Sequence, residues 1–541
     1  MLKNIQPICK PNNNILSKFK TTDMRFIKFL PLILIILSCE NETKQKPSVE
    51  PEKPKPNIVF IYMDDLGYGD ISAYGATEIQ TPNIDKLADG GVKFTKAYAS
   101  SATCTPSRYA ILTGSYPWRN EDAAILPGTA PLIIDTTQTT IPKMLKQEGY
   151  QTAVVGKWHL GLGLGNVNWN EEVKPGPNEV GFDYSYIMAA TQDRVPTVYL
   201  EDGQVVNLDP NDPIKIDYDN EFEGEITGYN HPELVTMKAD KQHNNTLVNG
   251  VPRIGHMTGG EAARWSDVDM ADHFLEKAQS YVRDQKEKAA PFFLYYALQQ
   301  PHVPRTPHPR FEGQTSLGPR GDVIAEADWV VGEFIKALKE EGQLENTLIV
   351  FSSDNGPVLD DGYEDEAVEK LGEHKPSGIY RGGKYSLFEA GSRVPFITYW
   401  EGKIKPRVSD ALVSQIDLLN SIANLVGSDL RTEDGENLLD VFMGKSAKGR
   451  ENMVIEAMSR TAYKKGDWVM IPPYDGPKVF ESKNIETAND DTYQLYNLKD
   501  DPSQQNNLAQ SNPDKLEELK EEFDQLRGDP YKNVKPAKFE K

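Results

Sequence analysis

The sequence predicts an α/β protein built on a large, mostly parallel β-sheet that is flanked by helices. Short apolar runs rich in β-branched and aromatic residues recur along the chain, and stretches with a helical pattern lie between them. Parallel strands have this composition because both faces of their sheet are covered. The clearest expected strands are residues 58–63, 152–155, 292–296 and 348–351, and the clearest expected helices are residues 139–148 and 322–340.

Composition sets the class of protein and of partner. A chain of 541 residues with 38% hydrophobic residues is typical of a globular protein with a sizeable core. The net charge of −22 argues against nucleic acid as a partner, because binding to phosphates needs clustered Lys and Arg. A small anionic substrate is not excluded, since surface charge is screened beyond about 8 Å at physiological salt and a pocket can be locally basic.

The N-terminus has the pattern of an export signal. From Met24 a short basic start leads into an apolar stretch that is shorter than the roughly 20 residues of a membrane-spanning helix. The Ile-Leu-Ser that precedes Cys39 resembles the lipobox of bacterial lipoproteins. We therefore expect residues 1–39 to be a leader and lipoprotein signal peptide, with translation starting at Met24 and a lipid attached to Cys39. An ordinary signal peptide or a membrane anchor is the alternative.

Residues 40–56, rich in Lys, Glu and Pro, are expected to be a tether. The expected location is outside the cytoplasm of a Gram-negative bacterium, in the periplasm or at the cell surface. Contact with the membrane would be made only through the lipid anchor.

Polar residues follow each of the four expected strands. Ligands bind at the carboxyl ends of the strands in sheets of this kind, so these residues are expected to meet at one edge of the sheet. The four clusters are Asp64-Asp65, Gly156 to His159, Gln300 to His302, and Asp354-Asn355-Gly356.

Cys104 is the single cysteine after Cys39, so the exported domain cannot contain an internal disulfide. It lies just before an expected helix that starts near Ser107, where a helix N-terminus favours an anion. A thiol of lowered pKa could be a nucleophile at this position, although that role would leave the acidic clusters unexplained.

The residues Cys-Thr-Pro-Ser-Arg at 104–108, followed by Leu-Thr-Gly at 112–114, resemble the signature of the formylglycine-dependent sulfatases, arylsulfatase-like members of the alkaline phosphatase superfamily. The resemblance covers nearly the whole mature chain. One difference is Ala390, where the family usually has glycine. The further matching segments are residues 57–59, 64–70, 81–88, 156–161, 353–356, 381–384, 493–498, 501–502 and 507–509.

The family resemblance implies a catalytic domain at residues 57–410. It also implies a smaller C-terminal subdomain at residues 411–541, with an antiparallel sheet and a helix near residues 514–527. In this family a separate formylglycine-generating or anaerobic sulfatase-maturing enzyme oxidises the cysteine, here Cys104, to formylglycine. The hydrated aldehyde would offer one hydroxyl to attack sulfur and a second to expel sulfate.

The metal ligands implied are Asp64, Asp65, Asp354, Asn355 and the modified residue 104. Oxygen donors suit Ca²⁺ or Mg²⁺, and the resemblance implies Ca²⁺, with Mg²⁺ as the alternative.

The resemblance also assigns catalytic roles. Arg108 would stabilise the modified residue and the metal site, and Lys157 would bind the oxygen of that residue and the sulfate. His159 would take the proton that drives re-formation of the aldehyde. His302 and Lys384 would contact the ester oxygen, with His302 as the general acid.

Substrate contacts are suggested by a few further residues. Asp193 and Arg194 can together grip vicinal hydroxyls, or form only a surface ion pair. His308 and His374 are further candidates for substrate contact. We expect the acidic run at residues 360–369 to be a solvated loop. The remaining histidines, expected to be structural or on the surface, are His231, His243, His256 and His273.

Residues 193–260 look like those of carbohydrate sulfatases that act on galactose-type sugars. This implies removal of sulfate from chain ends carrying 6-sulfated galactose or N-acetylgalactosamine, in an algal polysaccharide or a glycosaminoglycan. Two alternatives stay open. One is a phosphomonoester or phosphonate monoester hydrolase on the same fold, and the other is a non-catalytic glycan-binding lipoprotein.

Overall fold

The computed structural model describes residues 55–165, 167–532 and 534. The expected leader, the lipid attachment at Cys39 and nearly all of the tether lie outside the described residues, so these expectations stay predictions. Residues from Lys55 onward form one compact unit. Within the described part of the chain, no helix is long and apolar enough to cross a membrane.

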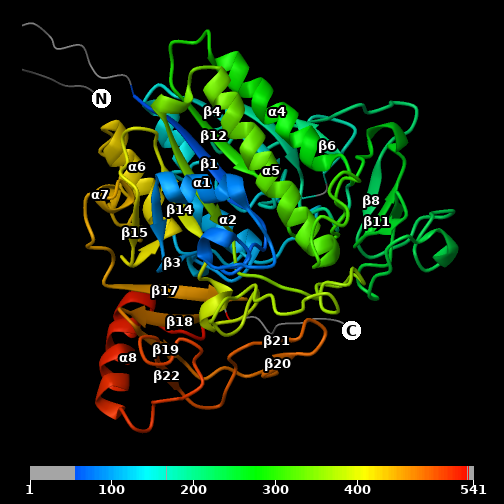
Figure 1. Cartoon of the computed structure of the whole chain (residues 1–541). Coiled ribbons are helices and arrows are strands. Elements are labelled where there is room, and N and C mark those ends of the chain that lie inside the picture. The colour runs from blue at the N-terminus through cyan, green and yellow to red at the C-terminus, as the bar shows by residue number, and fades with distance from the viewer. Residues whose placement is uncertain (1–54, 166, 533, 535–541) are drawn as a thin grey trace, which may run out of the picture. The chain divides into compact units, whose positions relative to one another are not determined.

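A mixed, mostly parallel sheet forms the centre of this unit (Figure 1). Its five central strands, from β13 to β5, run parallel to one another, and β14, β6 and β7 are antiparallel to their neighbours. This arrangement confirms the predicted fold class. The strand order, with bounds, is β15 (Arg407–Ser409), β2 (Val92–Phe94), β14 (Phe396–Tyr399), β13 (Thr347–Ser353), β1 (Asn57–Met63), β12 (Phe292–Ala297), β4 (Gln151–Lys157), β5 (Tyr184–Met188), β6 (Tyr199–Glu201) and β7 (Gln204–Val205).

Helices cover both faces of the sheet, which is why its strands are apolar on both sides. In β1, Phe60 packs into the core on one face and Ile61 into the core on the other. The first core is shared with α2 (Cys104–Thr113), α3 (Ile141–Gln147), α6 (Leu418–Val426) and α7 (Leu439–Phe442). The second core is shared with α1 (Pro82–Gly90), α4 (Met270–Gln285) and α5 (Gly318–Glu340).

A second, smaller sheet lies in the C-terminal part of the chain, below the large sheet in Figure 1. Its four strands are antiparallel, and α8 (Pro513–Arg527) packs on it through Leu519 and Phe523. The strands are β17 (Asn452–Ala457), β18 (Arg460–Lys465), β19 (Trp468–Ile471) and β22 (Gln494–Asn497). α6 and α7 belong to the core of the large sheet. The second sheet begins after them, at Asn452. The domain boundary at residue 410 stays a sequence-based prediction.

The remaining elements are short. The two-stranded pairs are β3 (Ala97–Tyr98) with β16 (Val413–Ser414), β8 (Lys215–Asp217) with β11 (His256–Thr258), β9 (Leu247–Val248) with β10 (Val251–Pro252), and β20 (Val479–Phe480) with β21 (Ile485–Glu486). The 3-10 helices are η1 (Ser72–Tyr74), η2 (Pro117–Arg119), η3 (Pro232–Leu234), η4 (Glu261–Ala263), η5 (Leu344–Asn346), η6 (Glu389–Gly391) and η7 (Gln415–Asp417).

Glu326 on α5 supports the segment that follows β12. Its carboxylate accepts hydrogen bonds from the backbone N–H of His308 at 3.1 Å and from Nε2 of Gln300 at 3.3 Å. The side chain is buried, and burial raises the pKa of Glu326 to about 7. The folded protein therefore holds a proton there that the unfolded chain releases near pH 4.5.

This shift predicts a pH-dependent effect of Glu326→Gln on stability. Between about pH 4.5 and pH 7 the folded state binds more protons at this site than the unfolded state, so ionisation of Glu326 costs wild-type stability as the pH rises. The free energy of unfolding of the variant minus that of wild type should be about 3 kcal/mol larger above pH 7 than at pH 4.5. Urea unfolding at several pH values measures this difference. Glu340→Gln, an exposed substitution on the same helix, should show no such trend.

Candidate active site

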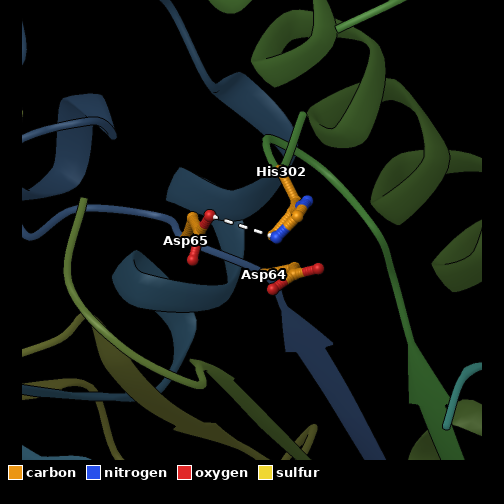
Figure 2. Close-up of side chains that lie close together, drawn as sticks. All are labelled: Asp64, Asp65 and His302. Atoms are coloured by element: carbon orange, nitrogen blue, oxygen red, sulfur yellow. Dashed lines mark ion pairs between the residues drawn. The ribbon is translucent and has the colours of Figure 1, made fainter. Parts of the chain in front are cut away.

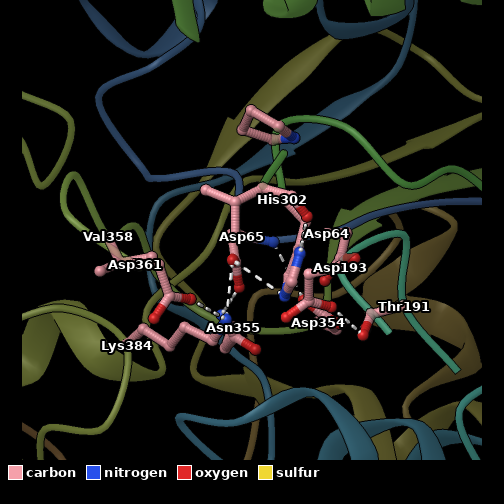
Figure 3. Close-up of polar contacts among 12 residues, drawn as sticks. Asp64, Asp65, Thr191, Asp193, His302, Asp354, Asn355, Val358, Asp361 and Lys384 are labelled. Carbon is pink, nitrogen blue, oxygen red and sulfur yellow. Dashed lines mark hydrogen bonds and ion pairs between the residues drawn. The ribbon is translucent and has the colours of Figure 1, made fainter. Parts of the chain in front are cut away.

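Four neighbouring parallel strands bring the predicted site residues to one edge of the sheet, as the sequence pattern indicates. In the order β13, β1, β12 and β4, they end at Ser353, Met63, Ala297 and Lys157. The residues that follow or end these strands are Asp354 and Asn355, Asp64 and Asp65, His302, and Lys157 with His159. Figure 3 shows Asp64, Asp65, His302, Asp354 and Asn355 gathered in one cluster.

The acidic residues of this cluster are fully buried. Asp64 and Asp65 are at most 1% exposed, and Asp65 adopts a left-handed backbone with φ of 64°. Such a backbone is uncommon outside glycine and is typical of functional sites. Nδ2 of Asn355 donates a hydrogen bond to Oδ1 of Asp65 at 2.7 Å, and the backbone N–H of Asp65 donates to Oδ1 of Asp354 at 3.2 Å. These two hydrogen bonds join the segments that directly follow β1 and β13.

Cations compensate these carboxylates. Nζ of Lys157 lies 2.6 Å from Asp64, and Nζ of Lys384 lies 2.8 Å from Asp65. Arg108, from α2, donates from Nε to Asp354 at 2.9 Å and places Nη2 at 2.8 Å from the same carboxylate. Buried charges are tolerated when they are paired in this way.

Lys157 has its position because Gly156 precedes it. Gly156 has φ of 110°, and a Cβ at this position would lie 1.9 Å from the carbonyl oxygen of Ala297 in β12. Only glycine allows this approach of the two strands next to the site. Ala390, by contrast, lies in η6 and is not among the residues with positive φ, so its difference from the family pattern requires no strained backbone.

The donor set fits a hard divalent cation. Oδ1 of Asp64 and Oδ1 of Asn355 are buried and have no hydrogen-bond partner among the described residues. Buried oxygens normally have a partner, and a cation would supply one. Ligand atoms of Asp64, Asp65 and His302 also lie within 4.8 Å of one another (Figure 2), and Nε2 of His302 is 3.8 Å from Asp65. The sequence assigns His302 to proton donation instead.

Cys104 is the first residue of α2, three residues before Ser107, where the sequence predicted the helix to start. It is 2% exposed and lines a cavity of about 410 Å³ together with His302 and Lys384. Burial raises the pKa of the Cys104 thiol, despite the opposing effect of Lys157 and Lys384. The unmodified thiol is therefore poorly ionised, which weighs against the alternative of a simple thiolate nucleophile.

The two predicted catalytic histidines are also buried. Nε2 of His159 lies 2.9 Å from the carbonyl oxygen of Leu126, while its Nδ1 has no partner among the described residues. Burial, then Lys157 and Arg194, hold the pKa of His159 well below its usual range. Burial, then Lys384 and Lys157, lower the pKa of His302 in the same way.

Asp193 and Arg194 line the same cavity as Cys104. Nη1 of Arg194 donates to both carboxylate oxygens of Asp193, at 2.7 and 2.8 Å, and to Oγ1 of Thr191 at 2.6 Å. Asp193 is buried and the side chain of Arg194 is 14% exposed in the cavity wall, so the two do not form the surface ion pair that the sequence left open.

His308 and His374 lie elsewhere. Neither is among the residues that line the cavity. His308 is partly exposed, with Nε2 at 3.8 Å from Asp269, and His374 is buried with Nε2 at 2.8 Å from Asp70. The sequence-based hypothesis that they contact the substrate is therefore not supported. His308 is close in sequence to His302, and His374 to Lys384, but neither histidine reaches the cavity that His302 and Lys384 line.

Family comparison decides the kind of site. The Sulfatase family model matches residues 56–428, more than half of the chain. The chain belongs to the sulfatase family. Its site is that of an enzyme, and the sequence-based expectation of a sulfuric ester hydrolase is confirmed.

Known relatives of this sulfatase cover almost its whole length. N-acetylgalactosamine-6-O-sulfatase of Bacteroides thetaiotaomicron is 48% identical over 508 residues, 93% of this chain and 99% of that protein. A solved structure described under the metabolism of multiple glycosaminoglycans by Bacteroides thetaiotaomicron is 49% identical with a TM-score of 0.86, covering 88% of this chain and 99% of the other. The phosphonate monoester hydrolase of Agrobacterium radiobacter shares the fold alone, with 17% identity and a TM-score of 0.53 over 87% of this chain and 95% of the other.

The sulfatase cavity also contains residues that sequence reasoning missed. Asp361 accepts hydrogen bonds from Nζ of Lys384 at 2.9 Å and from the hydroxyl of Tyr385 at 3.0 Å (Figure 3). It is 5% exposed, so the expectation of a solvated loop at residues 360–369 is wrong at this position. Lys483, from the turn between β20 and β21, approaches Asp361 to 3.4 Å. No local pattern distinguishes these residues from ordinary surface charges.

His243 is a further missed residue in the cavity wall. Its Nδ1 lies 2.6 Å from Asp240 and its Nε2 lies 3.4 Å from Asp193. Burial alone would lower the pKa of His243, but the two carboxylates outweigh burial and raise it. His243 is therefore not on the surface, one of the two positions expected for it, because it is buried beside Asp193 and lines the cavity.

The cation site predicts the behaviour of Asp64→Asn. This change keeps the side-chain size but removes a charged oxygen ligand, so Ca²⁺ should bind at least about tenfold more weakly to chelator-treated protein. Isothermal titration calorimetry measures the affinity. Asp89→Asn, an exposed change on α1, is the matched control and should bind Ca²⁺ as wild type does. Equal affinity in all three proteins would remove Asp64 from the ligand set.

Proposed function

We propose that this sulfatase removes the 6-sulfate from N-acetylgalactosamine or galactose at the end of a glycan chain. The full-length similarity to an N-acetylgalactosamine-6-O-sulfatase carries the proposal. The cavity supports it, since about 410 Å³ is in the range of sites for small ligands and suits a terminal sugar. Sulfated algal polysaccharides and glycosaminoglycans both contain such ends.

The nucleophile proposed is formylglycine made from Cys104 by a separate maturation enzyme, either a formylglycine-generating or an anaerobic sulfatase-maturing enzyme. Cys104 is buried at the start of α2, lines the cavity and is the free cysteine of the described residues. The hydrated aldehyde would supply one hydroxyl to attack sulfur, and a second hydroxyl, which a serine or cysteine lacks, to release sulfate.

The ion proposed is Ca²⁺, held by Asp64, Asp65, Asp354 and Asn355 and by the modified residue 104, with Mg²⁺ as the alternative. Four oxygen-donating side chains suit both ions, and a flexible ring of carboxylates favours Ca²⁺ over the stricter octahedron of Mg²⁺. The bound ion would withdraw charge from the sulfate oxygens as the S–O bond breaks.

Three cations of the chain surround the place where the sulfate would lie. Lys157 and Lys384 act electrostatically on Cys104, and Arg108 holds Asp354 while it contacts the carbonyl oxygen of Lys157 at 3.3 Å. Lys157 and Lys384 would bind sulfate oxygens and the ester oxygen, and Arg108 would hold the cluster in place. Fixed cations in a site without water stabilise a developing negative charge strongly.

His302 is the proposed general acid. Lys384 and Lys157 disfavour its charged form in the free enzyme. An anionic sulfate bound between these lysines would offset them and increase the proton affinity of His302, so that protonation follows substrate binding. His159, two residues after Lys157, is the proposed acceptor of the proton that would leave residue 104 when the aldehyde re-forms.

Recognition of the sugar is proposed for Asp193, Arg194 and His243. They form one hydrogen-bonded group in the cavity wall, and buried directional donors and acceptors discriminate between hydroxyl configurations.

Export as a lipoprotein anchored through Cys39, in the periplasm or at the cell surface, is also a proposal. It is supported by the basic start, the short apolar stretch and the Ile-Leu-Ser before Cys39.

A mass measurement tests the nucleophile. In protein from a host with an active maturation enzyme, the tryptic peptide that contains Cys104 should be lighter than its unmodified form by about 18 Da. Cys104→Ala should lack both the mass change and all turnover. An unmodified peptide from protein that still releases sulfate would contradict the proposed nucleophile.

His302→Ala tests the general acid and the reaction class together. Loss of the proton donor should lower kcat for N-acetylgalactosamine 6-sulfate roughly 10²–10⁴-fold with the fold intact by circular dichroism. His231→Ala, at a partly exposed histidine paired with Glu233, should retain wild-type turnover. The phosphate and phosphonate analogues are assayed beside the sulfate, and a higher kcat/KM for either would favour the alternative hydrolase.

A further inference from the structure

The C-terminal part of the chain contributes a wall of the cavity that the reaction does not use. The wall is formed by Glu456 near the end of β17, by Met458 in the turn between β17 and β18, and by Arg527, the last residue of α8. These residues line the same cavity as Cys104 but belong to the second sheet and its helix. They are therefore placed to meet a part of the substrate other than the sulfate and its sugar.

Arg527 is a buried cation without an anionic partner. It is 7% exposed and forms no ion pair with a carboxylate in the described part of the chain. Its Nη2 donates to the carbonyl oxygen of Lys532 at 3.0 Å, and its Nε has no hydrogen-bond partner there. The guanidinium lies 4.4 Å from the ring centroid of Trp118, which also lines the cavity. Burial lowers the pKa of Arg527.

Other buried arginines of the described residues differ from Arg527. Each is either paired with a carboxylate or, in Arg460, bonded to several carbonyl oxygens, since an uncompensated buried charge is costly. The buried arginines that are paired with a carboxylate are Arg108, Arg253, Arg305, Arg320, Arg393 and Arg450. An anion supplied by a ligand would give Arg527 the same compensation.

Glu456, the carboxyl group with the largest electrostatic effect on Arg527, does not supply that anion. Its Oε1 accepts a hydrogen bond from the backbone N–H of Ser459 at 3.3 Å, and its Oε2 has no partner in the described part of the chain. The side chain is 2% exposed, and burial raises its pKa to about 8. At neutral pH the carboxyl is largely protonated, so it can donate a hydrogen bond to an anion.

We propose that Arg527 and Glu456 form a subsite for an anionic group, a carboxylate or a second sulfate, on the sugar that adjoins the sulfated sugar in the glycan. The proposal rests on the carbohydrate sulfatase function proposed above and deepens it. A guanidinium binds either group through two parallel hydrogen bonds, and the contact with Trp118 fixes its orientation. Lys532, exposed at the same wall, adds positive potential.

A purely structural role for Arg527 makes a different prediction. As the last residue of α8 it favours the helix C-terminus and packs on Trp118. Its loss would then affect every substrate equally. The two roles are separated by comparing substrates that differ only in the charge of the second sugar.

Four probes make this comparison. They are N-acetylgalactosamine 6-sulfate, a disaccharide in which this sugar is linked to a hexuronate, the methyl ester of that disaccharide, and a disaccharide whose second sugar is a sulfated neutral hexose. Wild-type kcat/KM should be about tenfold higher for a disaccharide with an anionic second sugar than for the neutral ester. Whichever anionic disaccharide shows the higher value identifies the group bound.

Arg527→Gln should bring the ratio of kcat/KM for the anionic disaccharide to kcat/KM for the neutral ester close to one. It should leave kcat/KM for the monosaccharide unchanged. Arg119→Gln is the matched control, because Arg119 also lies 4.4 Å from the Trp118 ring but is paired with Asp434 and does not line the cavity. It should keep the wild-type ratio. An equal loss on all four probes in Arg527→Gln, or a wild-type ratio near one, would overturn the subsite.

Two further measurements keep the outcome decisive. If Arg527→Gln does not fold, Arg527→Lys takes its place, since it keeps the charge without the paired donors. Its ratio of kcat/KM between the anionic disaccharide and the neutral ester should lie between one and the wild-type value. The wild-type ratio alone can still refute the subsite. If no protein turns over the monosaccharide, the proposed function has failed. Calorimetric binding of the hexuronate disaccharide and its ester then tests the subsite separately, with preference for the anion supporting it and equal binding overturning it.

Discussion

The compensation of buried carboxylates by buried cations is the constraint on which the rest of this structure depends. Asp64, Asp65 and Asp354 lie at the ends of two adjacent strands, with no solvent to stabilise their charge. They are retained because Lys157 and Arg108 converge on them from another strand and from a helix. Since an uncompensated buried charge costs several kcal/mol, the cluster fixes the relative positions of β13, β1, β4 and α2.

The positive residues around the cavity explain how a chain with a net charge of −22 can bind an anionic substrate. The cavity is lined by Lys384, Arg194, Lys483 and Arg527, whereas most of the acidic residues are elsewhere on the molecule. Over the short distances inside a buried cavity, local charges outweigh the screened field of the surface. The oxygens of Asp64 and Asn355 that have no hydrogen-bond partner in the described part of the chain could hold a cation there.

The cavity also shows how the small C-terminal sheet takes part in function. Its own hydrophobic core is separate from the two cores of the large sheet. However, the end of β17, the β20–β21 turn and the end of α8 reach the cavity with Glu456, Lys483 and Arg527. The large sheet thus positions the proposed reacting groups, while the C-terminal part of the chain supplies groups that can face the remainder of a glycan.

The sequence by itself determined the fold class and the candidate residues at the edge of the sheet. Strand periodicity and the polar residues after each strand have local causes, because side chains at the end of a parallel strand must emerge at the same edge. For this reason Asp64, Lys157, His302 and Asp354 were predictable. The family resemblance added the role of Cys104.

Only the tertiary structure decided which other charged side chains share the cavity. Asp361, His243 and Arg527 come from loops and from a helix end, where no periodicity relates sequence position to direction. His308 and His374 looked equally suitable in sequence but lie against Asp269 and Asp70. Pairing between such residues depends on contacts between segments far apart in the chain, as in the approach of Lys483 to Asp361.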